Sequence, residues 1–357
     1  MKIIHVVGTR PNFMKLAPII RACNKYNVNY KIVHTGQHYD DNMSDIFFDE
    51  LEIEKPHYNL NIGSFSHADQ TAQIMQHFDV ICKLEEPDIV LVVGDVNSTL
   101  ACSLVVSKLD KIKLAHVEAG LRSFDRTMPE EVNRVVTDTI SDYLFCTNQE
   151  SADNLYRNKD VVGKVHVVGD VMIDTLLYHI NKIDIENDLE SYVLVTIHRP
   201  SNTNNKDNLG EILMALDEIS KTIKVVFPIH PRTNKKIEEF NLEKHLKNIE
   251  IWPAFGYMKF LKYMKNACVV ITDSGSIQVE TTVLNKYCIT IRENTEREFT
   301  LTEGTNILVP ANADKIYNKT MNYLLSSIPA YSVLDEERRA LYDGKAAERI
   351  IEILAEV

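Results

Sequence analysis

Short apolar runs rich in β-branched residues alternate with longer stretches of helical periodicity along most of the chain. Residues 3–8 are apolar throughout, which is typical of a strand buried on both faces. In residues 9–26 the apolar side chains recur with the spacing of one helix face, at Phe13, Leu16, Ile19, Ile20 and Cys23. The same reading predicts further strands at residues 30–36, 88–95, 113–120, 142–148, 164–170, 192–200, 224–230, 249–255, 267–276, 286–293 and 305–310. This alternation predicts an α/β fold with parallel sheets covered by helices on both faces.

A polar, acidic stretch at residues 181–191 separates two such series and is the predicted linker. The 357 residues are enough for two domains of ordinary size. We therefore expect two doubly wound, Rossmann-like domains, residues 1–180 and 181–344, facing a central cleft. Ligands of such folds bind outside the carboxyl ends of the strands. A last helix at about residues 345–357 is a candidate to pack back on the N-terminal domain.

Composition and missing signatures exclude several classes of protein. The formal net charge of −12 leaves no broad basic surface for nucleic acid. No apolar run approaches the roughly 18 residues of a membrane span, and the N-terminus is typical of a strand and not of a signal peptide. The six cysteines lack CxxC spacing, which favours reduced thiols and a cytoplasmic location. GxGxxG, P-loop and metal-ligand patterns are missing, so we expect no redox cofactor and no catalytic metal.

Two turns in the N-terminal half carry candidate site residues. In GTRPNFMK (8–15), Arg10 and Lys15 place positive charge near a helix N-terminus, where a phosphate binds well. The alternative is a pair of solvated cations on an exposed turn. In GDVNS (94–98), Asp95 ends a buried strand and is expected to point into the crevice. The alternative for Asp95 is a cap of the next helix, which is compatible with a catalytic role.

Residues 116–134, HVEAGLRSFDRTMPEEVNR, are the densest cluster of ionisable groups. Glu118 follows an apolar strand at the point where it enters its loop. Two carboxylates in a cleft can divide the roles of acid and base. Glu130 and Glu131 follow Pro129 in the first turn of a predicted helix, so one of the two is interpreted as a helix-terminus charge.

The C-terminal half repeats this arrangement. His198 and His230 each follow an apolar strand, and Arg199 supplies a cation beside the first. Residues 274–276, Ser-Gly-Ser, lead from a strand into a helix and are predicted to present N–H groups and hydroxyls to an anion. The alternative is an ordinary helix cap. Glu280 is placed to accept hydrogen bonds from two ribose hydroxyls. The loop holding Thr295, Glu296 and Arg297 is a candidate to close over the cleft.

The ordered motifs GTRPNFMKLAP, TGQHYDDNM, VVGDVNSTLA, HVEAGLRSFDRTMPEEVNR, HRPSN and TDSGSIQVE…RENTER…EGTN resemble the non-hydrolysing UDP-N-acetylglucosamine 2-epimerases over nearly the whole chain. The resemblance implies a glycosyltransferase-B-like fold, a UDP-binding C-terminal domain, a homodimer and interconversion of UDP-GlcNAc and UDP-ManNAc. It implies elimination of UDP to 2-acetamidoglucal, followed by re-addition. The implied catalytic set is Asp95, Glu118, Glu130 and His198, without an assignment of acid and base. The implied substrate contacts are Arg10, Lys15, Arg199, His230, Phe255, Ser274, Gly275, Ser276, Glu280 and Arg297.

Three positions depart from the family pattern. Ser276 replaces the second glycine, Val279 replaces the first of two glutamates, and Glu298 replaces a proline. These changes leave open a modified UDP-HexNAc as substrate. Three further alternatives are a hydrolysing relative that releases ManNAc and UDP, a glycosyltransferase, and a nucleotide-sugar binding module. Residues 60–70 carry no arginine, so activation by a second substrate molecule is not predicted.

Overall fold

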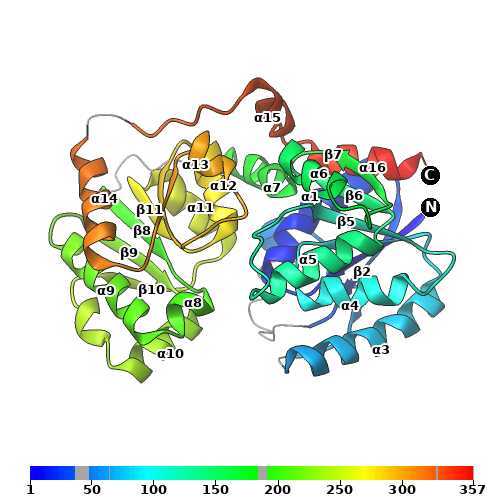
Figure 1. The fold of residues 1–357 in the computed structure, drawn as a ribbon, viewed down its shortest axis with the longest axis horizontal. Coiled ribbons are helices and arrows are strands. Elements are labelled where there is room, and N and C mark those ends of the chain that lie inside the picture. Colours follow the sequence, from blue (N-terminus) through cyan, green and yellow to red (C-terminus); the bar gives the residue numbers. More distant parts are fainter. Residues whose placement is uncertain (37–47, 64, 184–190, 327–328, 357) are drawn as a thin grey trace. The chain divides into compact units, whose positions relative to one another are not determined.

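The computed structural model describes residues 1–36, 48–63, 65–183, 191–326 and 329–356 (Figure 1). The chain forms two compact units, Met1–Tyr178 with Glu336–Val357, and His179–Asp335. Each unit is a parallel sheet with helices on its faces, so the predicted α/β fold of two doubly wound sheets is confirmed. Residues 184–190, in the predicted linker, and most of the TGQHYDDNM segment lie outside the described residues.

The first unit is built on a seven-stranded sheet of order β3-β2-β1-β4-β5-β6-β7. Its strands are β1 Lys2–Val7, β2 Asn29–His34, β3 Tyr58–Asn59, β4 Ile89–Val93, β5 Lys113–Ala119, β6 Tyr143–Cys146 and β7 Lys164–Val167. Its helices are α1 Arg10–Lys25, α3 His67–Glu85, α4 Asn97–Val106, α5 Pro129–Ile140, α6 Gln149–Tyr156, α7 Val171–Ile180, α15 Glu336–Leu341 and α16 Ala346–Ala355. Helix α7 runs across the boundary into the second unit.

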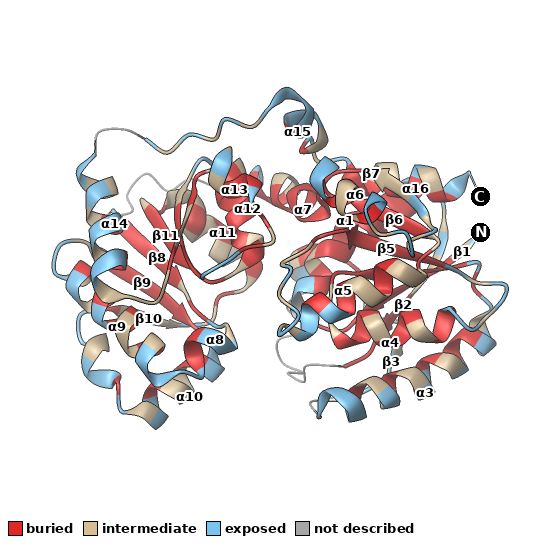
Figure 2. Ribbon diagram, viewed as in Figure 1, coloured by how far each residue is buried: buried red, intermediate tan, exposed pale blue. Residues whose placement is uncertain are grey.

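The strands at the centre of the first sheet are buried on both faces, as their mostly apolar runs predict (Figure 2). On one face Ile4 and Val6 of β1 belong to the same core cluster as Phe78 of α3 and Cys102 of α4. On the other face α1 contacts the C-terminal helix α16. Asp174 of α7 holds the start of α16 by accepting hydrogen bonds from the backbone N–H groups of Ala346 and Ala347 at 3.1 and 2.7 Å. The end of the chain therefore completes the N-terminal unit.

The second unit repeats the design on a six-stranded sheet of order β10-β9-β8-β11-β12-β13. Its strands are β8 Tyr192–Thr196, β9 Lys224–Ile229, β10 Glu250–Pro253, β11 Val269–Thr272, β12 Tyr287–Ile291 and β13 Asn306–Val309. Its helices are α8 Pro200–Thr203, α9 Lys206–Ser220, α10 Pro231–Phe240, α11 Tyr257–Asn266, α12 Gly275–Val283, α13 Phe299–Thr302 and α14 Ala313–Leu325, with a 3₁₀ helix at Glu243–Leu246. Helices α9 and α14 pack together over the apolar core of this sheet.

Both sheets place functional loops at a point where the strand order reverses. Strand β1 lies between β2 and β4, and β8 lies between β9 and β11. At such a switch point the loops after adjacent strands diverge and leave room for a ligand at the carboxyl ends. Most of the sequence-predicted residues lie at or after the carboxyl ends of β1, β4 and β5 in the first unit and of β8, β9 and β11 in the second, while Phe255 follows β10 and Arg297 follows β12.

Within the described residues, no helix is long and apolar enough to cross a membrane, and no cluster of three or more His, Cys, Asp or Glu side chains is arranged to hold a metal ion. The six cysteines are free thiols, and five of them are buried.

Candidate active site

Glu118 stands on an irregular backbone at the end of β5. The register between β5 and β6 shifts here, because Val117 pairs with Phe145 while Ala119 pairs with the next residue, Cys146. Glu118 is therefore the extra residue of a β-bulge, and its φ of 68° is in the left-handed region. Such a conformation is uncommon for a residue with a Cβ and is found mostly where the surroundings impose it.

Lys15 of α1 forms an ion pair with the buried Glu118 carboxylate. Only 4% of the Glu118 side chain and 11% of the Lys15 side chain are exposed. Gly94 makes room for this pair, since a Cβ built there would lie 3.0 Å from Lys15 Nζ and 3.6 Å from Glu118 Oε2. Gly94 also has a positive φ of 70°, which disfavours any side chain. Lys15 is thus a partner of Glu118, and the phosphate contact predicted for it stays a prediction.

The turn after β1 is held by Asn12, a residue that was not predicted from the sequence. Its side-chain oxygen accepts hydrogen bonds from the N–H groups of Gly8 and Thr9 at 3.1 and 3.0 Å. Its amide group donates to the carbonyl of Val93 at 3.2 Å, which ties the turn to the end of β4. The side chain of Arg10, the other predicted cation of this turn, lies outside the described residues.

Asp95 is fixed by an arginine of α5. Arg134 approaches Asp95 Oδ2 with Nε at 3.0 Å and Nη2 at 2.6 Å. Its Nη1 lies 2.8 Å from Glu131, which also accepts a hydrogen bond from the N–H of Ser123 at 2.8 Å. Arg134 was missed as a site residue, although its spacing of three residues from Glu131 predicts a pair on one helix face.

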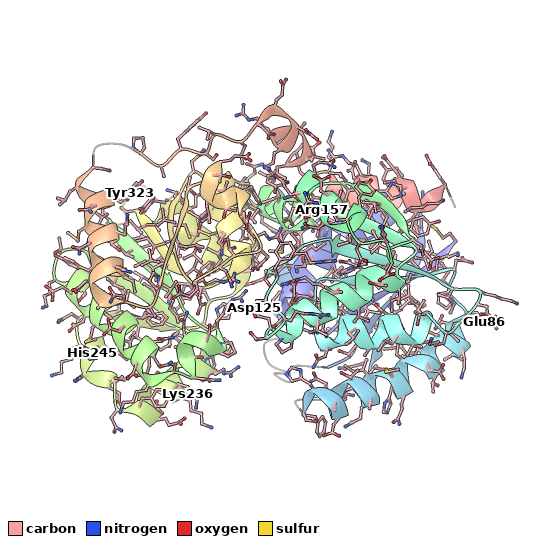
Figure 3. The ribbon with its side chains drawn as sticks, viewed as in Figure 1. Glu86, Asp125, Arg157, Lys236, His245 and Tyr323 are labelled. Atoms are coloured by element: carbon pink, nitrogen blue, oxygen red, sulfur yellow. The ribbon has the colours of Figure 1, made fainter. Side chains whose placement is uncertain are left out.

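The two glutamates at the start of α5 have different environments. Glu131 is buried within the Asp95–Arg134 network, whereas Glu130 is exposed. The preceding loop is shaped by Asp125, labelled in Figure 3, which accepts hydrogen bonds from the N–H and hydroxyl of Thr127 at 3.0 and 2.6 Å. Glu131 therefore has a structural role in this unit, and Glu130 is the glutamate that solvent or a ligand can reach.

In the second unit, Asp273 organises the loop after β8. This carboxylate is fully buried at the end of β11 and accepts hydrogen bonds from the N–H groups of His198 and Arg199 at 3.1 and 2.9 Å. His198 Nδ1 lies 3.3 Å from Asp273 Oδ1, while 44% of the histidine side chain stays exposed. The histidine is thus oriented by a buried carboxylate and remains accessible. Asp273 was missed because a carboxylate before Ser-Gly-Ser is equally typical of a cap.

The N-terminus of α12 contains the predicted Ser274, Gly275 and Ser276. Gly275 allows a close approach, because a Cβ there would lie 2.4 Å from Glu296 Oε1. Glu296 in turn lies 2.8 Å from Arg292 Nη2 and 3.7 Å from Arg199 Nη2. Two guanidinium groups and the helix N-terminus together favour an anion here. Arg297, the residue after Glu296, is buried, and its backbone N–H donates to Thr295 Oγ1 at 3.1 Å.

The remaining predicted residues of this unit occupy three places. Glu280 is buried in α12 and accepts a hydrogen bond from the hydroxyl of Tyr257 at 3.0 Å. Phe255 packs on the ring of Tyr263, with centroids 4.8 Å apart, and Lys259 Nζ lies 4.2 Å from the Phe255 ring centre. His230 caps α10 by accepting the N–H of Arg232 at 3.2 Å, and its ring lies 6.4 Å from that of His198.

The three departures from the family pattern have different positions. Val279 is 1% exposed within the core side of α12, and Glu298 is exposed at the start of α13. Ser276 is half-buried in the first turn of α12. Of the three, Ser276 is the one that lies at the anion-favouring helix terminus.

Comparison with known proteins identifies the family. The family profile described as UDP-N-acetylglucosamine 2-epimerase matches residues 21–355. The chain belongs to this family. The UDP-N-acetylglucosamine 2-epimerase of Methanocaldococcus jannaschii is 43% identical over 372 residues, covering 99% of both chains. The family inferred from the motifs, and the prediction that the chain is an enzyme of it, are therefore confirmed.

Solved structures and a second relative extend the comparison. The crystal structure of M. jannaschii UDP-GlcNAc 2-epimerase in complex with UDP-GlcNAc and UDP matches with a TM-score of 0.89 at 41% identity, over 100% of both chains. The UDP-2,3-diacetamido-2,3-dideoxy-D-glucuronate 2-epimerase of Pseudomonas aeruginosa is 38% identical, also over 100% of both chains. Relatives of similar length therefore carry names that specify two different UDP-sugars.

Proposed function

We propose that the chain catalyses the reversible C2 epimerisation of UDP-N-acetylglucosamine to UDP-N-acetylmannosamine. The observation that carries this proposal is the buried Glu118 carboxylate, held on a bulge with Lys15 at the carboxyl end of the sheet, in a chain of this family. UDP-GlcNAc and UDP are bound in the similar M. jannaschii structure, which supports the same substrate class here.

The proposed reaction has an elimination and an addition. A carboxylate takes the C2 proton, the bond between C1 and the diphosphate oxygen breaks with its electron pair going to UDP, and 2-acetamidoglucal is formed. UDP then adds back at C1 while a proton is delivered to the opposite face of C2. Carboxylates on the two sugar faces are needed for this sequence, and we assign the task to Asp95, Glu118 and Glu130.

Departure of the diphosphate is as demanding as removal of the proton, because the acetamido group stabilises a carbanion poorly. We assign stabilisation of the developing negative charge to His198, Arg199 and Arg10, together with the N–H groups at Ser274, Gly275 and Ser276. Asp273 orients His198 for this purpose. Glu280 is assigned to the ribose, His230 and Phe255 to the nucleotide pocket, and Arg297 to the loop that covers it. Lys15 compensates the charge of Glu118 within the buried site.

A modified UDP-HexNAc is the second candidate substrate. It is favoured by the P. aeruginosa relative, whose name specifies a diacetamido-dideoxy-glucuronate, and by Ser276 at the anion-favouring helix terminus. The hydrolysing alternative predicts free ManNAc. We also propose that the enzyme is a homodimer located in the cytoplasm.

The deciding experiment is incubation with UDP-GlcNAc in deuterated water, followed by NMR of the products. Deuterium at C2 of recovered UDP-GlcNAc and UDP-ManNAc is expected. Free ManNAc would show instead that the enzyme hydrolyses its substrate. Turnover of UDP-2,3-diacetamido-2,3-dideoxy-glucuronate alone would show that the substrate is the modified sugar.

Glu118→Gln is expected to lower kcat by about 10²–10⁴ with little change in binding, as loss of a proton-transfer group does. Glu86→Gln, on an exposed position at the end of α3, is the matched control.

A further inference from the structure

One buried carboxylate, Asp138 of α5, contacts the chain on both sides of Glu118. Asp138 Oδ1 lies 2.7 Å from Nδ1 of His116, two residues before Glu118. Asp138 Oδ2 accepts the N–H of Gly120, two residues after Glu118, at 3.2 Å, and lies 2.6 Å from Nη1 of Arg122. Asp138 and His116 are fully buried. A single side chain therefore bridges the bulge that carries Glu118.

His116 extends the bridge to the neighbouring strand end. Its Nε2 lies 2.8 Å from the carbonyl oxygen of Gly94. A carbonyl can only accept, so Nε2 donates to Gly94, while Nδ1 faces the Asp138 carboxyl group. Gly94 is the residue before Asp95, and its own N–H donates to the carbonyl of Val117 at 3.1 Å. The chain of contacts from Asp138 through His116 to Gly94 thus joins the backbone of Glu118 to the backbone that bears Asp95.

This network is poorly explained as a source of stability alone. A buried ionic cluster loses hydration and is often no better than apolar side chains of the same volume. A left-handed residue such as Glu118 persists only where its neighbours over-determine the backbone. Gly120 adds to this restraint, because it has a φ of 78° and a Cβ there would lie 2.1 Å from the carbonyl oxygen of Ser151. The contacts converge on the conformation of Glu118 and not on a solvent-facing surface.

We propose that Asp138 is a positioning residue for the epimerase reaction, acting through His116, Gly120 and Arg122 to set the placement of Glu118 relative to Asp95. The inference rests on the proposed role of Glu118. In this arrangement both ring nitrogens of His116 are engaged in structural hydrogen bonds, and the histidine carries no proton to or from the sugar. A displacement of about 1 Å in a reacting group is enough to cost about 10²-fold in rate.

The test compares Asp138→Ala with Asp138→Asn in the full chain. Asp138→Ala removes the bridge and is expected to lower kcat about 10²-fold while KM changes less than about threefold. Asn keeps an acceptor for Gly120 and Arg122 and places an amide group beside Nδ1 of His116, so kcat is expected to recover to within about tenfold of wild type. The control is Asp142→Ala. Asp142 bonds Lys113 and the N–H of Leu114 at the other end of β5, at 2.9 Å each, so its loss weakens the same strand away from Glu118.

Three results would overturn the inference. The first is a kcat of Asp138→Ala that is no lower than that of Asp142→Ala. The second is a kcat of Asp138→Asn as low as that of Asp138→Ala. The third is a large rise in the KM of Asp138→Ala with its kcat preserved. Imidazole ¹⁵N NMR gives an independent measurement: a His116 Nε2–H protected from exchange is expected in wild type, with this protection lost in Asp138→Ala, and identical His116 signals in the two proteins would also overturn the inference. If Asp138→Ala does not fold, His116→Leu takes its place, and its kcat is likewise expected to fall while its KM changes little. An active Glu118→Gln would instead refute the role proposed for Glu118, whereas an inactive one beside an unimpaired Asp138→Ala would refute this inference alone.

Discussion

The ion pair between Lys15 and Glu118 makes the site unusually sensitive to loss of one charge. Lys15→Met keeps most of the side-chain volume and leaves a carboxylate that is 4% exposed without its cation. Removing one partner of a buried pair costs about 3–5 kcal/mol of unfolding free energy. For a unit of this size, that loss lowers the melting temperature by about 6–20 °C.

A double-mutant cycle isolates the pair itself. In Lys15→Met/Glu118→Gln the buried carboxylate is gone, so the combined loss is expected to be smaller than the sum of the single losses by about 1–3 kcal/mol. Lys113→Met is the matched control, because Lys113 pairs with Asp142 at the surface, where the side chains are 53% and 36% exposed. Such a surface pair contributes at most about 1 kcal/mol.

The assay is thermal unfolding by circular dichroism, with hydrogen exchange of β1 and β5 to locate the loss. The single tryptophan, Trp252 of β10, gives a fluorescence signal for the second unit as an internal reference. A Lys15→Met variant as stable as Lys113→Met, or single losses that add within about 0.5 kcal/mol, would refute the assignment of Lys15 as the counter-ion of Glu118.

Three further predictions concern other parts of the chain. Burial raises the pKa of the Asp174 carboxyl from 3.8 to about 6, so the folded state holds this proton more tightly than the unfolded chain. Its stabilising contribution is complete below pH 3.8 and is lost as pH rises through 6, so urea titrations should show the stability of wild type falling by about 3 kcal/mol relative to Asp174→Asn between pH 4 and 7. Gly120→Ala should destabilise by about 2–4 kcal/mol, because its Cβ would meet a backbone oxygen at 2.1 Å in a left-handed conformation. Gly210→Ala inside α9, whose nearest contact lies at 3.9 Å, is the control and should be neutral or stabilising by up to about 1 kcal/mol. A Gly120→Ala variant that melts at the same temperature as Gly210→Ala would contradict this prediction. Asp273→Asn should lower kcat about 10-fold or more, because it weakens the acceptor that orients His198, and an unchanged pH–rate profile with full kcat would remove Asp273 from the site.

The family and the fold class were accessible from the order of residues. Segments such as residues 3–8 and 192–196 predict buried strands, because a short, mostly apolar run rich in β-branched residues is typical of a strand inside a parallel sheet. Candidate chemistry could also be located, since polar residues that directly follow such strands lie at the carboxyl edge of the sheet. Glu118, Asp95 and His198 were predicted on this ground, and their catalytic roles stay predictions. The two-residue strand β3 was not predicted, because two residues have no periodicity to read.

The partners of those residues were decided by tertiary structure. Lys15 is 103 positions from Glu118, and Asp273 is 75 from His198, so no local pattern links either pair. The choice between Glu130 and Glu131 depended on which one faces Arg134, which is set by how α5 packs on the sheet. The roles of Asn12 and Asp138 were invisible for the same reason. Local spacing determines which side chains share a face of one element, whereas a buried charge takes its partner from whichever element the packed core brings within reach.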